Sequence, residues 1–338
     1  MTLLVNDDEV RRILTVEDFL ESVEEAYREY GLKRAGADAF RYSYVPPPKR
    51  ELRIEGKGLP HGSPENMGIS QGMASLERMG MAVIQHSFRF RGRKGGMFHL
   101  IDTSDGKTLA IVMNNDGYIS RMRTAADGAI ASKYLSRRDS AVAGIIGTGR
   151  QGRTQLELLT KVRPIRKAYA HSGRRRDDDY AREMREELGI EVIATDGPEE
   201  VVKNSDVLVA VTRATTPIVK GDWLNRGTHI TSMGADCPLK VELDATVFRR
   251  ADKLVIDCEQ CLEVAQLRIP IESGILKLED IYGNIGEIVA GVKPRREEAS
   301  EITIYASTGM TVPYVAICAR IYEKSKRMGL GTETSSIL

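Results

Sequence analysis

The sequence predicts an α/β protein with two domains of different texture. Its 338 residues exceed the usual length of one domain, and a hydrophobic content of 41% is enough to fill two cores. Residues 40–116 read as short strands separated by Pro and Gly, which is typical of an antiparallel sheet. From residue 141 onward, apolar runs alternate with helical or polar stretches, and this alternation indicates a parallel sheet with right-handed crossovers. The runs that predict its strands are residues 142–147, 165–172, 207–212, 229–234 and 253–258.

The first part of the chain predicts a pair of helices followed by strands. Apolar residues recur at helical spacing over residues 7–33, where Thr15 or Asp18 is expected to cap the second helix. Strands are expected at residues 42–48, 51–56, 80–90 and 97–113. The alanine-rich stretch 123–137 predicts another helix, and the polar tail 329–338 is expected to be mobile.

Charge and composition exclude several classes of partner. The chain has 49 basic and 48 acidic residues, a formal net charge of +1, so no overall field attracts nucleic acid or an anionic membrane. The N-terminal residues are acidic where a signal peptide is basic and then apolar, and no apolar run is long enough to span a bilayer. Four cysteines are too few for a disulfide framework. We therefore expect a cytoplasmic protein that acts on a small molecule.

Cys258 and Cys261 form a C-x-x-C pair that invites a metal or redox interpretation. A zinc site needs a second pair of ligands, and the sequence contains no second C-x-x-C and no H-x-x-x-H. We expect small buried thiols at both positions and no bound metal.

Three glycines in the middle of the chain carry the strongest local signal. Gly147, Gly149 and Gly152 follow an apolar run and precede the helix-like QLELLTKV, in the spacing G-x-G-x-x-G. This is the dinucleotide fingerprint of the Rossmann fold, in which a tight turn, close approach of a pyrophosphate and close helix–strand packing each require a glycine. Together with Thr148, these residues are expected to bind the cofactor phosphates at a helix N-terminus.

The end of the next strand bears on the choice of cofactor. An NAD site usually has an acidic residue about twenty positions after the glycines, whereas an NADP site offers hydroxyl groups and arginine to the 2′-phosphate. Here Ser172, Arg174 and Arg175 occupy this region, which favours NADP(H) and leaves NAD(H) possible. Alternatively, the arginines are the solvated start of a helix, paired with acids 177–179.

The chain resembles the ornithine cyclodeaminase and mu-crystallin family along nearly its whole length. The resemblance lies in the phrases RMRTAADGAIASKYL, GTGRQG, VTRATTPIV, GADCPLKVEL and STGM, of which GADCPLKVEL is the most specific. It implies a Rossmann NAD(P)-binding domain, residues 126–305, inserted into an α+β substrate-binding domain of residues 1–125 and 306–338. The latter is expected to form a homodimer through its sheet.

The family's chemistry implies roles for particular residues. Members pass hydride between nicotinamide and the Cα atom of an amino acid or its imine. Arg41 and Arg123 match the two arginines that bind the substrate carboxylate, a group that suits a guanidinium fork. Asp236 matches the aspartate that manages the proton on the substrate nitrogen.

Several further positions are expected near the cofactor. Thr212, Met233 and Ser307 fall at strand ends and are expected beside the nicotinamide, and Thr124 is expected near the phosphates. The closing segment departs from the family pattern, because Ala306 stands where an acid is common and TVPYVA replaces the usual continuation.

One departure affects the substrate site directly. The family usually has a lysine in the strand MGMAVIQH, where this chain has Ala82. Either Gln85 or His86 supplies a polar substitute, or the substrate differs from the common α-amino acids. Strand alternation places Ala82 and His86 on one face of the sheet.

Three functions are therefore open. The first is an NAD(P)H-dependent oxidoreductase acting on the C–N bond of an amino acid or its imine, either an imine or ketimine reductase or an amino acid dehydrogenase. The second is a cyclodeaminase that releases ammonia, against which the missing lysine counts. The third is a carrier that binds NADPH without turnover.

Overall fold

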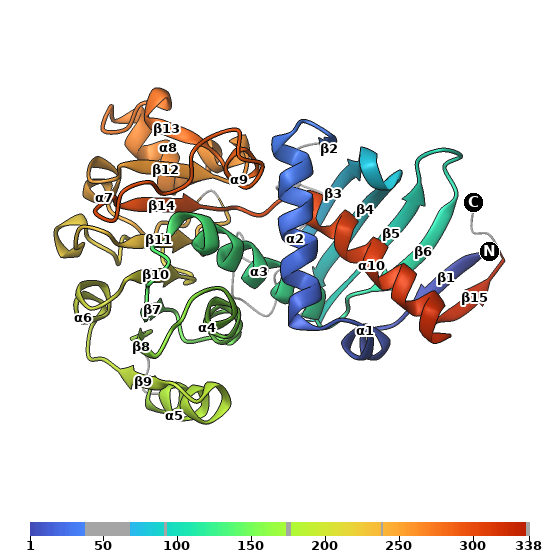
Figure 1. Ribbon diagram of the computed structural model, residues 1–338, viewed down its shortest axis with the longest axis horizontal. Helices are drawn as coiled ribbons and strands as arrows, with labels where there is room; N and C mark the ends of the chain where they lie inside the picture. The colour runs from blue at the N-terminus through green and yellow to red at the C-terminus, as the bar shows by residue number, and fades with distance from the viewer. Residues whose placement is uncertain (38–67, 91–92, 174–176, 238, 336–338) are drawn as a thin grey trace, which may run out of the picture. The chain divides into compact units, whose positions relative to one another are not determined.

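The computed structural model describes residues 1–37, 68–90, 93–173, 177–237 and 239–335. Its backbone contacts divide the chain into two compact units. Unit 1 comprises Met1–Arg123 and Met310–Leu338, and unit 2 comprises Thr124–Gly309 (Figure 1). The strands expected at residues 42–48 and 51–56 lie outside the described residues.

In the described part of unit 1, seven strands form one sheet in the order β15-β1-β6-β5-β4-β3-β2. The strands are β1 (Thr2–Val5), β2 (Ala35–Ala37), β3 (Gly68–Leu76), β4 (Met81–Phe90), β5 (Arg93–Asp102), β6 (Thr108–Met113) and β15 (Thr332–Thr334). Strands β1 and β6 are parallel, and the other neighbours are antiparallel. The expectation of a mobile tail is wrong for β15, because its backbone pairs with β1 and so protects the edge of the sheet.

Three helices pack in the described part of unit 1: α1 (Asp7–Ile13), α2 (Val16–Gly31) and α10 (Val312–Met328). The expected cap of the second helix is Thr15, whose hydroxyl accepts a hydrogen bond from the Asp18 backbone amide at 3.2 Å. The Asp18 carboxylate accepts one from the Thr15 amide at 2.8 Å, which completes a capping box. Helix α10 packs against α2 and against strands β3, β4, β5 and β6 (Figure 1).

Side chains of β4 alternate between the two faces of this sheet. Val83 and Gln85 are buried on the same face as Phe98 and Leu100, their partners on β5. Ala82, Ile84 and His86 are less buried and belong to the other face, as strand alternation predicts.

In the described ranges of unit 2, eight parallel strands form a sheet in the order β13-β12-β14-β11-β10-β7-β8-β9. The strands are β7 (Val142–Ile146), β8 (Lys167–His171), β9 (Glu191–Ala194), β10 (Val207–Ala210), β11 (His229–Ser232), β12 (Lys253–Ile256), β13 (Ile281–Asn284) and β14 (Thr303–Ala306). The chain runs from β7 outward to β8 and β9, and then returns to β10 on the other side of β7. This reversal is the switch point at which open α/β sheets bind ligands. The predicted α/β fold with a Rossmann-type sheet is confirmed.

Helices cover both faces of the unit 2 sheet. They are α3 (Tyr118–Leu135), in which the unit boundary falls, α4 (Arg150–Val162), α5 (Asp177–Leu188), α6 (Pro198–Lys203), α7 (Ala245–Arg249), α8 (Ala265–Glu272) and α9 (Ile285–Val289). Leu156 of α4 and Tyr180 of α5 join Ile145 in one apolar core. Val201 of α6 and Phe248 of α7 join the next residue of β7, Ile146, in another. Successive strand residues therefore serve opposite layers, as parallel sheets require.

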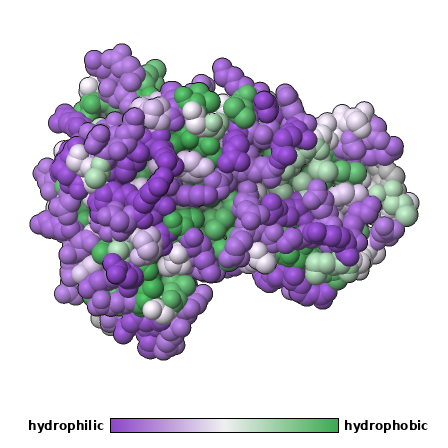
Figure 2. Space-filling model, viewed as in Figure 1, coloured by the Kyte–Doolittle hydropathy of each residue, from purple (hydrophilic) through white to green (hydrophobic). Residues whose placement is uncertain are grey.

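The surface fits the balanced composition. The face drawn in Figure 2 is mostly hydrophilic, with hydrophobic residues in separate patches. Within the described ranges, no helix has both the length and the apolar character needed to cross a bilayer.

Candidate active site

The glycine loop of unit 2 connects β7 to α4. Gly147 has φ of 111°, and a Cβ atom there would lie 2.7 Å from the carbonyl oxygen of Val211. A Cβ atom at Gly152 would overlap the carbonyl oxygen of Gly147, whereas one at Gly149 would have none of the described atoms within 4 Å. The first and third glycines are thus required by the fold itself, and the second leaves open space beside the backbone.

The N-terminus of α4 opens onto this loop. Gly149 is the N-cap residue, and no side chain of the described residues caps the helix. The backbone N–H groups of a first turn have no partner within their own helix, and the helix dipole is positive at this end. The open space and the donors together fit a pyrophosphate.

Thr148 and Ser172 are joined by Asp177, for which no contact with the glycine loop is predicted from the sequence. The Asp177 carboxylate accepts hydrogen bonds from the Ser172 amide at 2.8 Å, the Ser172 hydroxyl at 2.5 Å and the Thr148 hydroxyl at 2.8 Å. Asp177 is only 7% exposed. Arg174 and Arg175, expected beside Ser172, lie outside the described residues.

A buried carboxylate holds the ends of β10 and β11. Glu242 accepts hydrogen bonds from the amide and hydroxyl of Thr212, at 2.6 and 2.9 Å, from the Ser232 hydroxyl at 2.8 Å and from the Gly234 amide at 2.8 Å. Burial raises the pKa of Glu242, and these hydrogen bonds oppose the rise. Glu242 therefore fixes Thr212 and the turn that leads to Asp236.

Asp236 follows β11 at the carboxyl end of the sheet. Its side chain is 33% exposed and forms an ion pair with Lys240, whose side chain is only 9% exposed. No role is predicted from the sequence for Lys240 or Glu242, although both lie in GADCPLKVEL. The spacing of this phrase gave no indication of which charged side chains turn toward the strand ends.

Gln155 of α4 holds two of the expected cofactor neighbours. Its side-chain nitrogen donates to the Thr124 carbonyl oxygen at 3.0 Å and lies 3.1 Å from the Met233 sulfur atom. Thr124 and Met233, which are 109 positions apart in the sequence numbering, thus meet at one amide group.

Two buried carboxylates hold the segment that starts at Ser307. The Ser307 hydroxyl lies 3.0 Å from an Asp127 oxygen and 2.8 Å from an Asp257 oxygen. Asp257 also accepts the backbone amides of Thr308 and Gly309, at 3.0 and 2.6 Å. The Ser307 hydroxyl is therefore engaged inside the protein, so its expected contribution to cofactor binding does not come from a free hydroxyl. No motif in the sequence indicates that Asp127 and Asp257 hold this segment.

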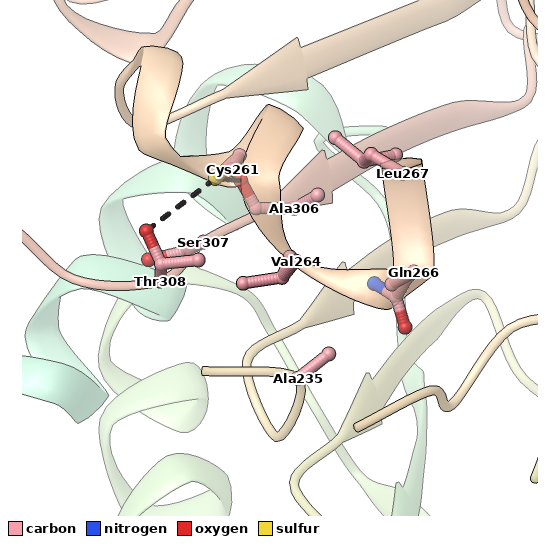
Figure 3. Close-up of a pocket in the computed structure, with 8 residues that line it drawn as sticks. All are labelled: Ala235, Cys261, Val264, Gln266, Leu267, Ala306, Ser307 and Thr308. Carbon is pink, nitrogen blue, oxygen red and sulfur yellow. Dashed lines mark hydrogen bonds between the residues drawn. The ribbon is translucent and has the colours of Figure 1, made fainter. Parts of the chain in front are cut away.

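A small pocket lies beside this segment, within unit 2 (Figure 3). Ala235, from the turn after β11, and Ala306, Ser307 and Thr308, at the end of β14, line part of it. The rest is lined by Cys261 of the 3₁₀ turn η3 (Glu259–Glu263), by Val264, which precedes α8, and by Gln266 and Leu267 in the first turn of α8.

Cys261 lines this pocket, and its sulfur atom lies 2.7 Å from an Asp257 oxygen and 3.6 Å from the Thr308 hydroxyl. Burial raises the pKa of both Cys258 and Cys261, which favours the protonated thiols. Cys261 is buried as expected, whereas Cys258 is only partly buried.

In unit 1, Arg123 is buried against Tyr314. Its Nη2 atom donates to the Tyr314 hydroxyl at 3.1 Å, and its guanidinium carbon lies 4.8 Å from the centre of the Tyr314 ring. The Tyr314 ring in turn lies 4.5 Å from the ring of Phe98, which is paired with Gln85. The other expected arginine, Arg41, lies outside the described residues.

Gln85 and His86 belong to different surroundings. The Gln85 side-chain nitrogen donates to the Ser87 hydroxyl at 3.3 Å, and its oxygen has no hydrogen-bond partner in the described part of the chain. On the other face, His86 lies 3.3 Å from the Gln71 side-chain nitrogen and 5.5 Å, ring to ring, from His99. Only Gln85 shares the face that leads to Arg123.

Several known proteins resemble this chain over most of its length. The model of the ornithine cyclodeaminase/mu-crystallin family matches residues 91–329. The chain belongs to this family. It is 32% identical to the alanine dehydrogenase of Archaeoglobus fulgidus, over 98% of each sequence. It is 27% identical to a Delta(1)-pyrroline-2-carboxylate reductase of Bacillus cereus, over 98% of this chain and 99% of the relative.

Two solved structures are similar to this chain over nearly its whole length. One is the Delta(1)-pyrroline-2-carboxylate reductase of Thermococcus litoralis in complex with NADH and L-proline, with a TM-score of 0.87 and 31% identity, covering 98% of this chain and 100% of that one. The other is an archaeal alanine dehydrogenase dimer with bound NAD, with a TM-score of 0.85 and 31% identity, covering 99% of each chain. The family expected from the motifs is therefore confirmed.

Proposed function

We propose that this protein is an oxidoreductase that uses a pyridine nucleotide to act on the C–N bond of an amino acid or its imine. The observation that carries this proposal is the carboxyl edge of the unit 2 sheet, where the open glycine loop after β7 and the Asp236–Lys240 pair after β11 belong to one set of parallel strands. The alanine dehydrogenase and the pyrroline carboxylate reductases support it, because both are named for reactions at such a bond.

The cofactor class follows from the glycine loop. The space beside Gly149 and the N–H groups at the start of α4 are proposed to hold the pyrophosphate, with Thr124 nearby. Thr212, Met233 and Ser307 are proposed as neighbours of the nicotinamide, which supplies or accepts the hydride when it is bound. Glu242, Gln155 and Asp257 contact Thr212, Met233 and Ser307, respectively, and would keep these neighbours of the nicotinamide rigid.

Asp236 is proposed to hold the proton that the nitrogen gains or loses. Reduction of an imine requires a proton on nitrogen, and oxidation of an amine requires its removal. A carboxylate that is one-third exposed can reach a substrate, while the buried ammonium of Lys240 balances its charge on the protein side.

Arg123 is proposed to bind the substrate carboxylate, since Tyr314 orients its guanidinium group. Arg41 remains a second candidate. Ala82 replaces the lysine that is usual in the family, and Gln85 and His86 are the two candidates for a polar substitute. Their surroundings favour Gln85. The buried Gln85 oxygen can accept a hydrogen bond from a substrate N–H group, and it lies next to the Phe98–Tyr314–Arg123 series of contacts.

The test is a spectrophotometric screen of NADH and NADPH oxidation. Substrates would include cyclic imino acids, and 2-oxo acids supplied with ammonia or methylamine. Asp236→Asn is expected to lower kcat at least about a hundredfold, the scale of general acid–base catalysis, without loss of nucleotide binding. Asp105→Asn is the matched control, because Asp105 also forms an ion pair with a lysine, Lys107, but on the surface.

Full turnover by the Asp236→Asn protein would remove the proposed role of Asp236. Ammonia release from ornithine without net change in NADH would instead select a cyclodeaminase. Tight nucleotide binding with no turnover of any substrate would select the carrier.

We also propose that the protein is a homodimer formed through unit 1. A row of directly opposed residues crosses five strands on the sheet face that α10 leaves uncovered. The row consists of Met73, Ile84, His99, Ile111 and Leu4. Its outer members Met73 and Leu4 are 48% and 37% exposed, and its inner members are partly exposed. Four of the five are apolar, and such a row on a sheet suits a self-complementary interface.

Analytical ultracentrifugation tests the dimer. Ile84→Glu is expected to yield monomers, since it would bury two carboxylates at the two-fold interface. Leu278→Glu, at a position in unit 2 that is 61% exposed, should leave the dimer intact. A monomeric unaltered protein would exclude the interface.

A cytoplasmic location is proposed from the thiols. All four cysteines are free, and two of them, Cys261 and Cys318, are buried. Such cysteines are typical of proteins in a reducing compartment. Fractionation of the source cells with an antibody would test this location.

A further inference from the structure

We infer that Asp177 makes this protein selective for NAD(H) over NADP(H), by engaging the hydroxyl groups that a 2′-phosphate would need. The inference rests on the proposed function, because it presumes that the glycine loop binds a pyridine nucleotide. It departs from the preference for NADP(H) that the residues around Ser172 indicate by sequence alone.

Asp177 connects the two segments that border the adenosine site in a Rossmann domain, the end of the second strand and the glycine loop. It is the first residue of α5, and its carboxylate reaches back to the end of β8 and across to the glycine loop. In a Rossmann domain the adenine ribose lies between these two segments, and an acidic residue there binds the 2′-hydroxyl. In the sequence, Asp177 comes later than the position, about twenty residues after the glycines, at which this acidic residue is usually found. Its hydrogen bonds nevertheless place its carboxylate beside Ser172 and Thr148.

The donors around Asp177 are already in use. The Ser172 amide, the Ser172 hydroxyl and the Thr148 hydroxyl each have one proton, and each lies within 2.8 Å of an Asp177 oxygen. These are the groups that an NADP site would direct at the phosphate. A phosphate could use them only by displacing the carboxylate.

The negative charge of Asp177 also disfavours NADP(H). A phosphate monoester carries between one and two negative charges near pH 7, and a buried carboxylate beside it would be repelled. Within the described residues, the nearest ring nitrogen is His171 Nδ1, 3.8 Å from Asp177, and it also lies 2.9 Å from the Thr195 carbonyl oxygen. That carbonyl accepts the Nδ1 proton, so the histidine does not offer this hydrogen to a phosphate.

Asp177 still has capacity for a ribose. A carboxylate has about four lone-pair positions, and three are taken by the hydrogen bonds from Ser172 and Thr148 described above. The Oδ2 atom accepts only the Ser172 amide among them, so it can accept a ribose hydroxyl as well. An NAD ribose therefore gains a hydrogen bond where an NADP phosphate meets a charge of its own sign.

The experiment is a fluorescence titration of the full-length protein with NADH and with NADPH. We expect the unaltered protein to bind NADH at least about tenfold more tightly, the factor that one hydrogen bond to a charged group is worth. Asp177→Asn should lower the ratio of NADPH to NADH dissociation constants at least about tenfold. The matched control is Asp178→Asn, the same charge change at the next, exposed residue, which should leave the ratio unchanged.

The outcomes separate the inference from the proposed function. If the unaltered protein binds neither nucleotide, the proposed function fails. If it binds NADPH more tightly, the arginines before α5 dominate and the inference is overturned. It is also overturned if Asp177→Asn and Asp178→Asn change the ratio equally. Should Asp177→Asn not fold, Asp177→Ser removes the same carboxylate, and the same fall in the ratio is expected.

Discussion

Glu242→Gln is a direct test of how the carboxyl edge of the unit 2 sheet is held together. The substitution keeps the size of the side chain and replaces one carboxylate oxygen by an NH₂ group. The oxygen that remains can keep both bonds from Thr212, at 2.6 and 2.9 Å. The NH₂ group then faces the Ser232 hydroxyl and the Gly234 amide, which both donate to the carboxylate in the native protein.

The magnitude follows from these contacts. Ser232 can rotate its hydroxyl and accept, but the Gly234 N–H cannot, so one hydrogen bond to a charged group is lost and a buried donor is left unpaired. Together these changes cost about 3–5 kcal/mol. Because burial raises the pKa of Glu242, its ionised form carries a desolvation cost that glutamine lacks. We therefore expect a loss near the lower end, about 3 kcal/mol, and a fall in Tm of about 6–10 °C.

Urea unfolding and calorimetry measure this loss. The control is Glu272→Gln, where the side chain is 62% exposed and pairs with Arg268 on the surface, so the expected change is below about 0.5 kcal/mol. A loss of less than about 1 kcal/mol at Glu242, or an equal loss at Glu272, would show that the carboxylate does not hold the strand ends.

Three further predictions address the loop, the pH dependence and the ion pair. Gly152→Ala would push a Cβ atom into the carbonyl oxygen of Gly147 and should weaken NADH binding at least about tenfold by fluorescence titration, whereas Gly197→Ala, with none of the described atoms within 4 Å, should not. Burial holds the pKa of His229 well below its usual value, so the unfolded chain takes up the proton first and the free energy of unfolding should fall by up to about 1.4 kcal/mol per pH unit below about pH 6.5. Urea unfolding of a His229→Asn variant should show a shallower dependence, and an unchanged slope would refute the assignment. Lys240→Met removes the buried ammonium beside Asp236 and should lower kcat at least about tenfold while leaving the Kd for NADH within about twofold, as stopped-flow kinetics would show.

Features that depend on neighbours along the chain can be predicted from the amino-acid order alone. The spacing of Gly147, Gly149 and Gly152 after an apolar run predicted the turn, because only glycine tolerates the backbone at the first position and the packing at the third. Thr15 was identified as one of two possible caps because a capping box spans only four residues. Motifs such as GADCPLKVEL were enough to indicate the family, which the family match confirms.

Features that depend on contacts between distant parts of the chain could not be predicted in this way. Strand β14 comes late in the chain yet lies between β11 and β12, and β15 pairs with β1 across almost the whole sequence. Asp127 meets Tyr305 178 positions away, and Asp257 meets Gly309 52 positions away. The physical reason is that hydrophobic periodicity reports which face of an element is buried, whereas the partner of a buried polar group depends on sheet order and crossover geometry. Asp177 is an example. Its position in the sequence is too far from the glycines to predict a contact with the cofactor, but its hydrogen bonds to Ser172 and Thr148 place it at the glycine loop.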